Sequence, residues 1–537
     1  MDDTFCNKSF SGDIRLLIIL SVYFILGIFL LKYYQYQINP DGIQYILIAK
    51  SYFTGNFHTA IDAYWGPLIS WLLVPFLFFG QSPIYELLST KILALIVGSV
   101  TIVGVRFLSY RFKMNETIRT VLLFSLIPII LFFALFAITP DLLTVCVLVY
   151  YLYFIFDPDY YQKYNNAIFC GILGSLAYFS KSFALPFFLI HFFIFNIFHV
   201  LAIAKNRRRK VVKNFLLGVL VFVLISGIWV ALISDKEGKI TIGTSGEVNH
   251  ALVGPDSKGP VQFFKGFDKP QISVSNPQWS PLNSWSNFKF QLEIIWNNIQ
   301  KELLSYQLFS LFSIIIMFTY FLLCLKPLKQ LINDRDVLYP LTTIILLSVL
   351  YLPIVVEASY LWLGYILLLL MAGFLINIIL EKTIISKIAK IILLFVVAAS
   401  FAYMPVSFLA NNTNINKELY YSSLDLKTQY NINGNIASND QLDTMKFISF
   451  YMGTNYYGQA PKNITDDQLA SDLKELDIDY YFVWDNSINN SSTEGNLIAN
   501  GYYLDIGDSA KNSKILTSYE PSNQGKMKYF KIYAVKE

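Results

Sequence analysis

Charged residues at the edges of long apolar segments are costly, so each of them raises the question of a function. Asp41 occurs in the segment NPDG, Asp141 in TPDLL, Lys181 in YFSKS, and Glu357 with Tyr360 in EASY. A carboxylate can abstract a proton, and an ammonium group can neutralise a developing anion. If these side chains meet on one face of a membrane, they can transfer a group away from an anionic leaving group.

Each of these positions also has a purely structural interpretation. Asp41 and Asp141 both follow a proline and can favour the start of a helix, as a cap or through the helix dipole. Lys181 can extend along apolar surface to reach water. Glu357 can be an ordinary loop acid beside Tyr360, an interfacial aromatic residue.

Two further residues are candidates for binding a substrate. Tyr45 follows Asp41 in the same polar segment, and His58 lies slightly further on, in FHT. His58 can bind a metal or donate to a phosphate, although a surface histidine is the favoured interpretation. The other histidines show no ligand spacing, so a divalent metal is possible but not favoured.

The composition predicts a polytopic α-helical membrane protein. Of 537 residues, 55% are hydrophobic and only 15% are charged, whereas soluble domains have about a quarter. The apolar runs exceed the ~18 residues that mark a spanning helix. We predict about eleven transmembrane helices, at 14–32, 84–105, 117–137, 140–156, 166–180, 183–200, 214–234, 304–325, 338–356, 361–380 and 388–410.

The basic residues predict the orientation of these spans. With a cytoplasmic N-terminus, 17 lysines and arginines fall in the inner loops and only 3 in the short outer loops. This parity requires the apolar stretch Pro67–Gly80 to be an interfacial or re-entrant helix on the outer side. The expected location is a plasma or inner membrane, with outer loops at 33–81 and 235–300.

The last part of the chain, 411–537, is predicted to be a small extracytoplasmic α/β domain, after a transmembrane module at 1–410. It has 11 lysines, no arginine and 16 acidic residues, a net charge of −5 in a chain of net charge +4. Strands are expected at Asn435–Ser438, Ile478–Trp484 and Met527–Val535, and a helix at Asp440–Phe450. Thr465 and Gln468 form a capping box for another helix. The charge pattern does not suggest nucleic-acid binding.

Several motifs together resemble the C-class membrane glycosyltransferases, especially the protein O-mannosyltransferase and aminoarabinose-transferase-like branch. They are, in order, Asp41 with its downstream Tyr45, Trp65-Gly66-Pro67-Leu68, Thr139-Pro140-Asp141, and Leu176–Ser182 with Lys181, followed more loosely by Glu357–Tyr360. The resemblance covers residues 14–200 well and 338–380 loosely.

The chain departs from the family pattern at three positions. Gly42 occupies the place of a second first-loop acid, so Asp141 would have to supply that role. Ser359 replaces the arginine before Tyr360, which weakens any clamp on an anion there. Ser182 replaces the glycine after Lys181.

The resemblance implies the C-class fold and an inverting transfer of sugar from a polyprenyl-phosphate donor to a lipid, glycan or protein acceptor. It implies Asp41 as the base and Lys181 as the contact to the donor phosphate. The partners would then be the donor, the acceptor and the membrane lipids.

Two other functions remain open. A lipid-linked-sugar flippase or polysaccharide polymerase would have a similar number of spans, but a flippase would place charges along a central path, whereas these gather at the outer rim. A non-catalytic scaffold would tolerate loss of Asp41 and Lys181.

Overall fold

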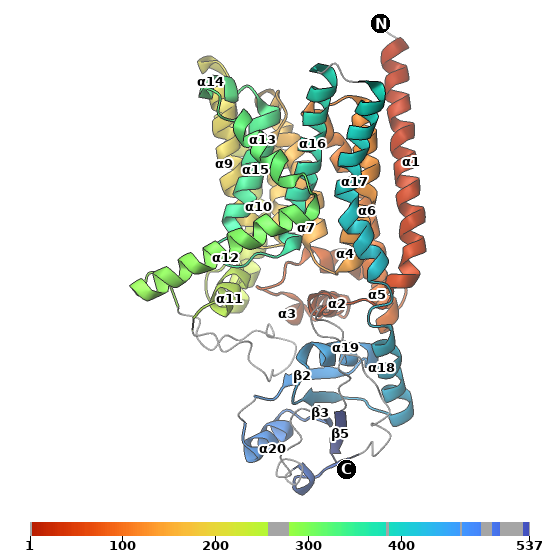
Figure 1. The fold of residues 1–537 in the computed structure, drawn as a ribbon. Coiled ribbons are helices and arrows are strands. Elements are labelled where there is room, and N and C mark those ends of the chain that lie inside the picture. Colours follow the sequence, from red (N-terminus) through yellow and green to blue (C-terminus); the bar gives the residue numbers. More distant parts are fainter. Residues whose placement is uncertain are drawn as a thin grey trace.

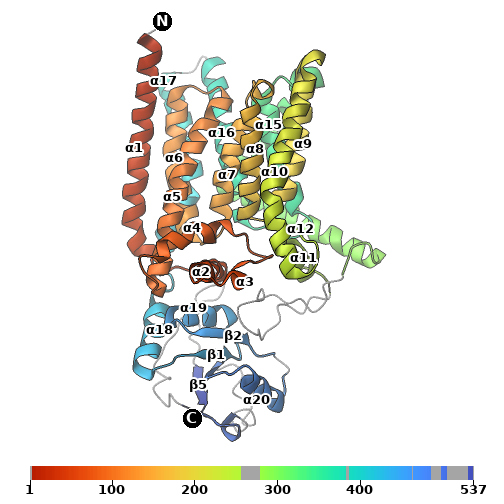
Figure 2. The same ribbon diagram turned by 180° about the vertical axis from the view of Figure 1, so that it is seen from behind.

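The structure is a computed structural model that describes residues 3–255, 279–382, 386–461, 464–484, 497–504 and 530–535. An upright bundle of helices carries a small sheet domain at one end, and the N-terminus lies at the other end (Figures 1 and 2). A layer of short helices lies between the bundle and the sheet domain. The chain is therefore divided into a membrane part, a boundary layer and a polar domain.

Seven helices among the described residues are long and apolar enough to cross a membrane, as expected of an integral membrane protein. They belong to α1 (Asp3–Tyr34), α5 (Pro83–Ser109), α6 (Glu116–Phe136), α9 (Ala184–Ala202), α10 (Arg208–Glu237), α16 (Trp362–Lys382) and α17 (Lys387–Asn411). The apolar stretches of α6 and α16 are 78% and 72% buried, whereas that of α1 is 17% buried. The first two helices therefore form the centre of the bundle, and α1 lies at its edge.

Four of the eleven predicted spans correspond to shorter helices. These are α7 (Asp141–Ile155), α8 (Tyr164–Ser180), α13 (Ser313–Leu323) and α15 (Arg335–Tyr351). α7 packs against α5 and α8, and α8 packs against α10, so both lie within the bundle. Helix length does not confirm the count of eleven, although these helices lie upright beside the longer ones (Figures 1 and 2).

The predicted span 304–325 is wrong in its course. Its first part belongs to α12 (Trp285–Phe309), which runs obliquely across the end of the bundle and meets α13 at an angle of 108° (Figure 1). Leu303, Leu304 and Leu308 on α12 are all more than a third exposed. They supplied the apolar signal, but they form the outer face of an oblique helix. Hydropathy alone cannot distinguish these two arrangements.

The boundary layer consists of short helices at the domain end of the bundle. They are α2 (Pro40–Phe53), α3 (Phe57–Ala60), α4 (Leu68–Leu77) and α11 (Ser245–Leu252). α4 has ten residues and lies beneath the bundle, which agrees with a short interfacial or re-entrant helix at 67–80 (Figure 1). The remaining short elements are α14 (Leu328–Leu331) and the 3-10 turns η1 (Tyr110–Phe112), η2 (Tyr160–Gln162), η3 (Lys205–Arg207) and η4 (Ala358–Leu361).

The C-terminal domain is a five-stranded mixed sheet with helices. The strand order is β2-β1-β3-β5-β4, with β1 parallel to β2 and β3, and β5 antiparallel to β3 and β4. The elements are α18 (Lys417–Tyr430), β1 (Asn435–Ser438), α19 (Leu442–Met452), β2 (Asn455–Gln459), α20 (Asp466–Glu475), β3 (Tyr480–Trp484), β4 (Tyr502–Leu504) and β5 (Phe530–Val535).

The strands and helices predicted for this part of the chain are largely confirmed. β1 has the predicted bounds, and β3, β5 and α19 lie within two or three residues of theirs where the structure describes them. Residues 527–529 of the last predicted strand lie outside the described residues. The Thr465 hydroxyl accepts from the backbone N–H of Gln468 at 3.3 Å, so the predicted cap is present. α18 and β2 were not predicted.

Hydrogen bonds from the C-terminal part fix the linker between α1 and α2. The backbone N–H of Asn414 donates to the carbonyl of Tyr33 at 2.7 Å, and the Asn416 amide donates to the carbonyl of Ile38 at 3.3 Å. The Tyr451 hydroxyl on α19 donates to the carbonyl of Tyr36. The sheet domain is thus tied to the segment that leads directly into α2.

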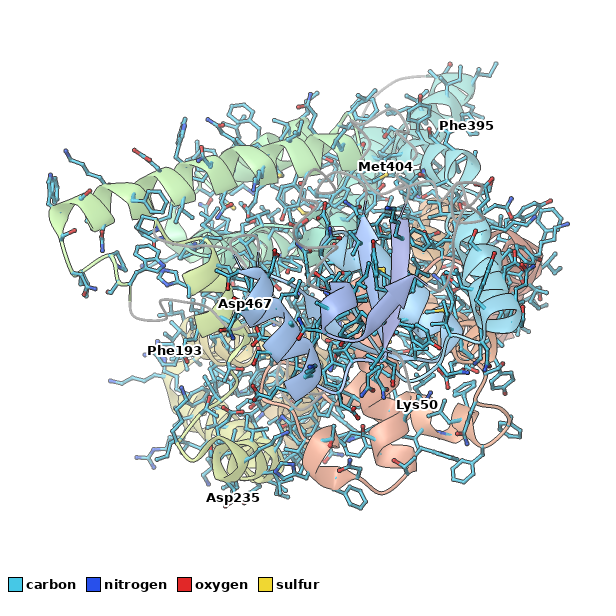
Figure 3. All side chains as sticks on the ribbon, turned by 90° about the horizontal axis from the view of Figure 1, so that it is seen from below. Lys50, Phe193, Asp235, Phe395, Met404 and Asp467 are labelled. Carbon is cyan, nitrogen blue, oxygen red and sulfur yellow. The ribbon has the colours of Figure 1, made fainter. Side chains whose placement is uncertain are left out.

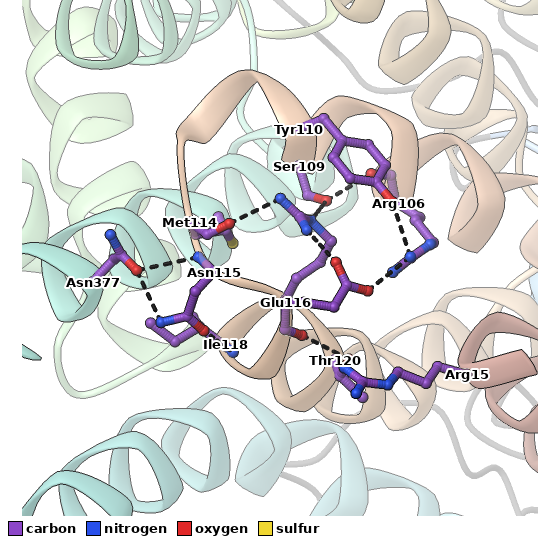
Figure 4. A network of polar contacts seen from close by, with 11 residues as sticks. Arg15, Arg106, Ser109, Tyr110, Met114, Asn115, Glu116, Ile118, Thr120 and Asn377 are labelled. Atoms are coloured by element: carbon purple, nitrogen blue, oxygen red, sulfur yellow. Dashed lines mark hydrogen bonds and ion pairs between the residues drawn. The ribbon is translucent and has the colours of Figure 1, made fainter. Parts of the chain in front are cut away.

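A charged network holds the opposite end of the bundle (Figure 4). Arg106 donates to Glu116 at 2.8 Å, and Arg119 forms a second ion pair with Glu116. Arg119 also donates to the Ser109 hydroxyl and to the Met114 carbonyl, each at 2.9 Å. Both arginine side chains are less than a tenth exposed. These basic residues of the predicted inner face therefore also join α5 to α6.

The arrangement predicts which surfaces can be labelled from each side of the membrane. Lys210, at the start of α10, and Lys474, on α20, are both exposed and lie at opposite ends of the molecule. In a chain whose four cysteines are replaced by alanine, we expect Lys210→Cys and Lys474→Cys to react with a membrane-impermeant maleimide from opposite sides. Labelling of both from one side would contradict this topology.

Candidate functional site

Asp41 lies in the first turn of α2, at the boundary between the bundle and the C-terminal domain. Asn39 is the N-cap residue and Pro40 is the first residue of the helix. Asp41 is therefore not the cap, and that structural interpretation is wrong. Its side chain is exposed, so the carboxylate is accessible beside a helix N-terminus, where negative charge is favoured.

Asn39 attaches this turn to the start of α7. Its side-chain oxygen accepts from the backbone N–H of Ile138 at 2.8 Å, and its amide donates to the carbonyl of Ile138 at 3.4 Å. Gln37 donates to the carbonyl of Phe136 at 2.6 Å. A Cβ atom at Gly42 would lie 2.7 Å from the Cβ of Ile138. The glycine therefore permits a close approach that a second acid at this position would prevent.

Asp141 and Lys181 form an ion pair at the end of the bundle. Lys181 Nζ lies 2.7 Å from Asp141 Oδ1, with the two side chains 19% and 6% exposed. Asp141 is the first residue of α7, and Lys181 follows the last residue of α8. A carboxylate at a helix N-terminus and an ammonium at a helix C-terminus each suit the local dipole. The two termini thus position the pair.

Aromatic rings cover the ammonium group of Lys181. Its Nζ lies 3.3 Å from the centroid of the Tyr360 ring and 5.6 Å from that of Tyr351. The Tyr351 ring stacks on Tyr360 and, at 3.6 Å between centroids, on Phe183. Cation–π attraction strengthens when the cation is withdrawn from water. Tyr360 therefore lies at the site, as predicted from the EASY segment.

The carboxylates around Lys181 oppose the effect of burial, which is the larger of the two and leaves the pKa of Lys181 below its usual value. Burial lowers the pKa of Lys181, whereas Asp141, Asp41 and Glu357 raise it, with Asp141 contributing most of that opposing effect. Glu357 is exposed at the start of η4. Asp41, Asp141, Lys181 and Glu357 are therefore electrostatically linked, and we refer to these four residues as the charge cluster.

The pKa of the Asp41 carboxyl is raised above its usual value. Desolvation raises the pKa of Asp41 most, because protein surrounds the group closely even though it reaches solvent, and the charge on Asp141 raises it further. Lys446 and Lys181 lower it, in that order of size. A raised pKa makes a carboxylate a better proton acceptor at neutral pH.

Residues of the first outer loop form the surroundings of Asp41. Asp62 accepts hydrogen bonds from the backbone N–H groups of Tyr64 and Trp65 at 2.7 and 2.9 Å. The Trp65 ring then packs edge-on against Tyr45 at 5.2 Å. Tyr45 is 3% exposed. It contributes a buried wall beside Asp41, and its predicted role in binding a substrate stays a prediction.

Gly66 brings this loop against the residues before Lys181. A Cβ atom at Gly66 would lie 2.6 Å from the carbonyl oxygen of Phe179 and even closer to that of Ser180. Nearby, the Trp71 ring of α4 packs against Phe179 at 5.6 Å. The Trp-Gly-Pro motif therefore has a steric explanation.

A partly open cavity of about 210 Å³ adjoins Lys181. Its polar wall includes Lys181, Ser182 and the start of α11, where Ser245 and Ser182 are 2.6 Å apart. An apolar wall comes from the end of α15 and the loop after it. The residues of that wall are Leu350, Tyr351, Ile354 and Val355. The cavity thus has one cationic corner and an apolar side.

His58 contacts the surroundings through its backbone. Its carbonyl accepts from Lys236 Nζ at 2.8 Å, and the carbonyl of Ile61 accepts from the same group at 2.6 Å. The His58 side chain is exposed on α3. None of the described contacts around Lys181 includes that side chain, so its role in substrate binding stays a prediction.

Several residues of this site carry no recognisable signal in the sequence. Asn39, Asp62 and Tyr351 could not be assigned because their partners are distant in the sequence or are backbone groups. Lys446 lies in the C-terminal domain and has no sequence motif. Among the described residues there is no group of three or more His, Cys, Asp or Glu side chains placed to hold a metal ion.

The tight fit at Gly66 generates a prediction about stability. Gly66→Ala should lower the thermal unfolding midpoint of the purified protein, because overpacking of this kind costs about 1–3 kcal/mol. Gly227→Ala on α10 is the matched control, since nothing lies within 4 Å of its added Cβ. Equal midpoints for the two variants would contradict the steric role of Gly66.

Comparison with known proteins shows similarity at the level of structure. No family model and no curated protein match the chain. ArnT from Cupriavidus metallidurans bound to undecaprenyl phosphate has a TM-score of 0.58 and 11% identity, covering 96% of this chain and 97% of that chain. The apo state of ArnT also has a TM-score of 0.58, with 12% identity and the same coverage.

A third solved structure is the oligosaccharyltransferase AglB from Archaeoglobus fulgidus, in complex with an inhibitory peptide and a dolichol-phosphate. It has a TM-score of 0.49 and 10% identity, over 95% of this chain and 74% of that chain. The likeness to ArnT extends over nearly the whole of both chains. It shows that this chain has the fold of ArnT, a C-class membrane glycosyltransferase.

Proposed function

We propose that this chain is a glycosyltransferase that moves a sugar from a polyprenyl-phosphate donor to a lipid, glycan or protein acceptor. The observation that carries the proposal is the Lys181–Asp141 pair at the corner of a half-apolar cavity, with the accessible carboxylate of Asp41 in the same charge cluster. The motif order and the ArnT fold support it. The sugar is either a hexose or a pentose.

In the proposed reaction, Asp41 accepts the proton of the attacking acceptor group. The acceptor oxygen or nitrogen forms a bond to the anomeric carbon, and the bond from that carbon to the phosphate oxygen breaks. The electron pair leaves with the polyprenyl phosphate. Attack opposite the leaving group inverts the anomeric configuration.

Lys181 receives the phosphate in this proposal. Its ammonium group already borders the cavity and is held by Asp141 and the Tyr360 ring. A donor phosphate would add a second anion on the cavity side and neutralise the charge that develops as the bond breaks. Asp141 would hold Lys181 in position and share in the catalytic cluster, in place of the missing first-loop acid.

The apolar wall suits the lipid part of the donor. Leu350 at the end of α15 and Ile354 and Val355 in the loop after it line the cavity together with the serines. The first isoprene units would lie along this wall while the phosphate remains at Lys181. Tyr45, His58 and Glu357 would contact the sugar or the acceptor from the side of the first outer loop and η4.

The site would face the extracytoplasmic side of a plasma or inner membrane. The basic residues of the loops at the opposite end support this orientation, because such residues favour the cytoplasm. The N-terminus would then be cytoplasmic and the domain after Asn411 extracytoplasmic.

Asp41→Asn should reduce transfer by about 10²–10⁴-fold, the usual contribution of a general base. The measurement is single-turnover consumption of radiolabelled lipid-phosphate sugars by purified protein, with a panel of hexosyl and pentosyl donors. Asp425→Asn on the exposed face of α18 is the control for the same chemical change. Turnover by Asp41→Asn equal to the wild type would exclude Asp41 as the base.

Lys181→Gln should raise the KM for the donor and lower kcat, because it removes a charge that contacts the phosphate in both the bound and the transition states. Lys32→Gln removes an exposed charge at the same end of the bundle and should leave both constants unchanged. Unchanged donor affinity in Lys181→Gln would place the phosphate elsewhere.

A further inference from the structure

The helix α19 brings the C-terminal domain directly against α2. The two helices pack together, and α19 also contacts α5. Figures 1 and 2 both place α19 immediately beneath α2. The Tyr451 hydroxyl donates a hydrogen bond to the carbonyl of Tyr36. This bond fixes the position of α19 against the linker that precedes Asp41.

Lys446 on α19 is an unusually covered lysine. Its side chain is 15% exposed, although lysine side chains normally extend into water. Asp443, one turn earlier, is 3.4 Å away and 68% exposed. A long ion pair with a solvated partner compensates a covered charge only weakly. The helix that packs against α19 here is α2, which carries Asp41 in its first turn.

Asp41 is under the electrostatic influence of two aspartate–lysine pairs. The bundle supplies Asp141 with Lys181, and the C-terminal domain supplies Asp443 with Lys446. Among the groups that lower the pKa of Asp41, Lys446 has a larger effect than Lys181. Lys181 is already bound to Asp141, whereas Lys446 has only the exposed Asp443 among its described partners.

The other elements packed against α2 supply few charges near its first turn. α3 carries His58, α4 carries no ionisable residue, and the Glu86 side chain of α5 pairs with Lys50 at the far end of α2. Two phenols, Tyr45 and Tyr64, are also electrostatically linked to Asp41.

Figure 3 views the molecule from the side of the C-terminal domain. The sheet and its helices occupy the middle of the view, while the segment with Lys50 lies beside them. In this view the described part of the domain overlies part of the boundary layer and does not overlie the segment with Lys50.

We propose that Lys446 is a positioning residue of the transfer site, which keeps Asp41 in the carboxylate form from the side of α19 and so makes the C-terminal domain a part of that site. This inference rests on the proposed function, in which Asp41 is the base. Lys446 acts through Asp41 and need not contact the substrate. The domain would then complete the electrostatic surroundings of the base, in addition to covering the membrane part.

The test measures the protonation of Asp41 itself in the full-length protein. A hydrophobic carbodiimide adds to protonated carboxyl groups, and mass spectrometry of the digest gives the pH dependence of the adduct at Asp41. In Lys446→Gln we expect labelling to persist to higher pH, because loss of a nearby positive charge favours the neutral acid. In Asp443→Asn we expect labelling to end at lower pH, because a nearby negative charge is lost.

Two variants control for structural damage. Lys446→Arg keeps the charge and should restore the wild-type labelling profile. Lys474→Gln makes the same substitution on α20, at the far side of the domain, and should not move the profile. A Lys446→Gln profile equal to the wild type, or an equal shift in Lys474→Gln, would overturn the proposal. If Lys446→Gln fails to fold, the shift in Asp443→Asn decides.

The transfer assay separates this inference from the proposed function. If the chain transfers sugar, the acidic limb of kcat/KM should move with the labelling profile: to higher pH in Lys446→Gln and to lower pH in Asp443→Asn. If the wild type consumes no lipid-phosphate sugar, the proposed function fails, while a shifted labelling profile still establishes the electrostatic link. If the wild type is active but the labelling profile of Lys446→Gln is unshifted, the positioning role of Lys446 is rejected and the proposed function is retained.

Discussion

The ion pair between Lys181 and Asp141 is the interaction on which the arrangement of the site depends. Two mostly covered charges 2.7 Å apart must be held accurately, because removing either partner leaves the other uncompensated. The helix termini position the pair, because α7 begins with Asp141 and α8 ends immediately before Lys181. Stacked rings of Tyr360, Tyr351 and Phe183 then keep water from one side of the cation.

The remaining parts of the boundary layer place Asp41 near this pair. Asn39 bonds to both backbone groups of Ile138, and Gly66 lets the first loop touch the end of α8. The C-terminal domain adds a third attachment through Tyr451. Three segments that are far apart in the sequence therefore converge on one short helix, α2. Such convergence can keep a carboxylate at a fixed distance from a cavity without placing it inside the membrane.

Much of this could be predicted from the sequence, for identifiable reasons. Long apolar runs and the distribution of basic residues depend on local composition, so the membrane class could be inferred from the sequence alone. For the same reason, the sequence could predict that Asp41, Asp141, Lys181 and Glu357 lie at the same end of the bundle. The capping box at Thr465 was equally local. The hydrogen bonds between the Asn39 side chain and the backbone of Ile138 could not be predicted, since the two residues are 99 positions apart. The course of 304–325 was wrong because hydropathy does not distinguish an outward apolar face from a crossing. Lys446 gave no signal because only tertiary packing brings α19 to α2.

The fit around Gly42 limits how this chain can vary. An added Cβ there would overlap the side chain of Ile138, whose backbone is held by Asn39. Because the contact is with the Cβ of Ile138, which every residue except glycine carries, an acidic residue at position 42 would require glycine at 138 or a shift of the backbone between them. Positions 42 and 138 should therefore vary together among related chains. An engineered second carboxylate at position 42 would require a change at both positions.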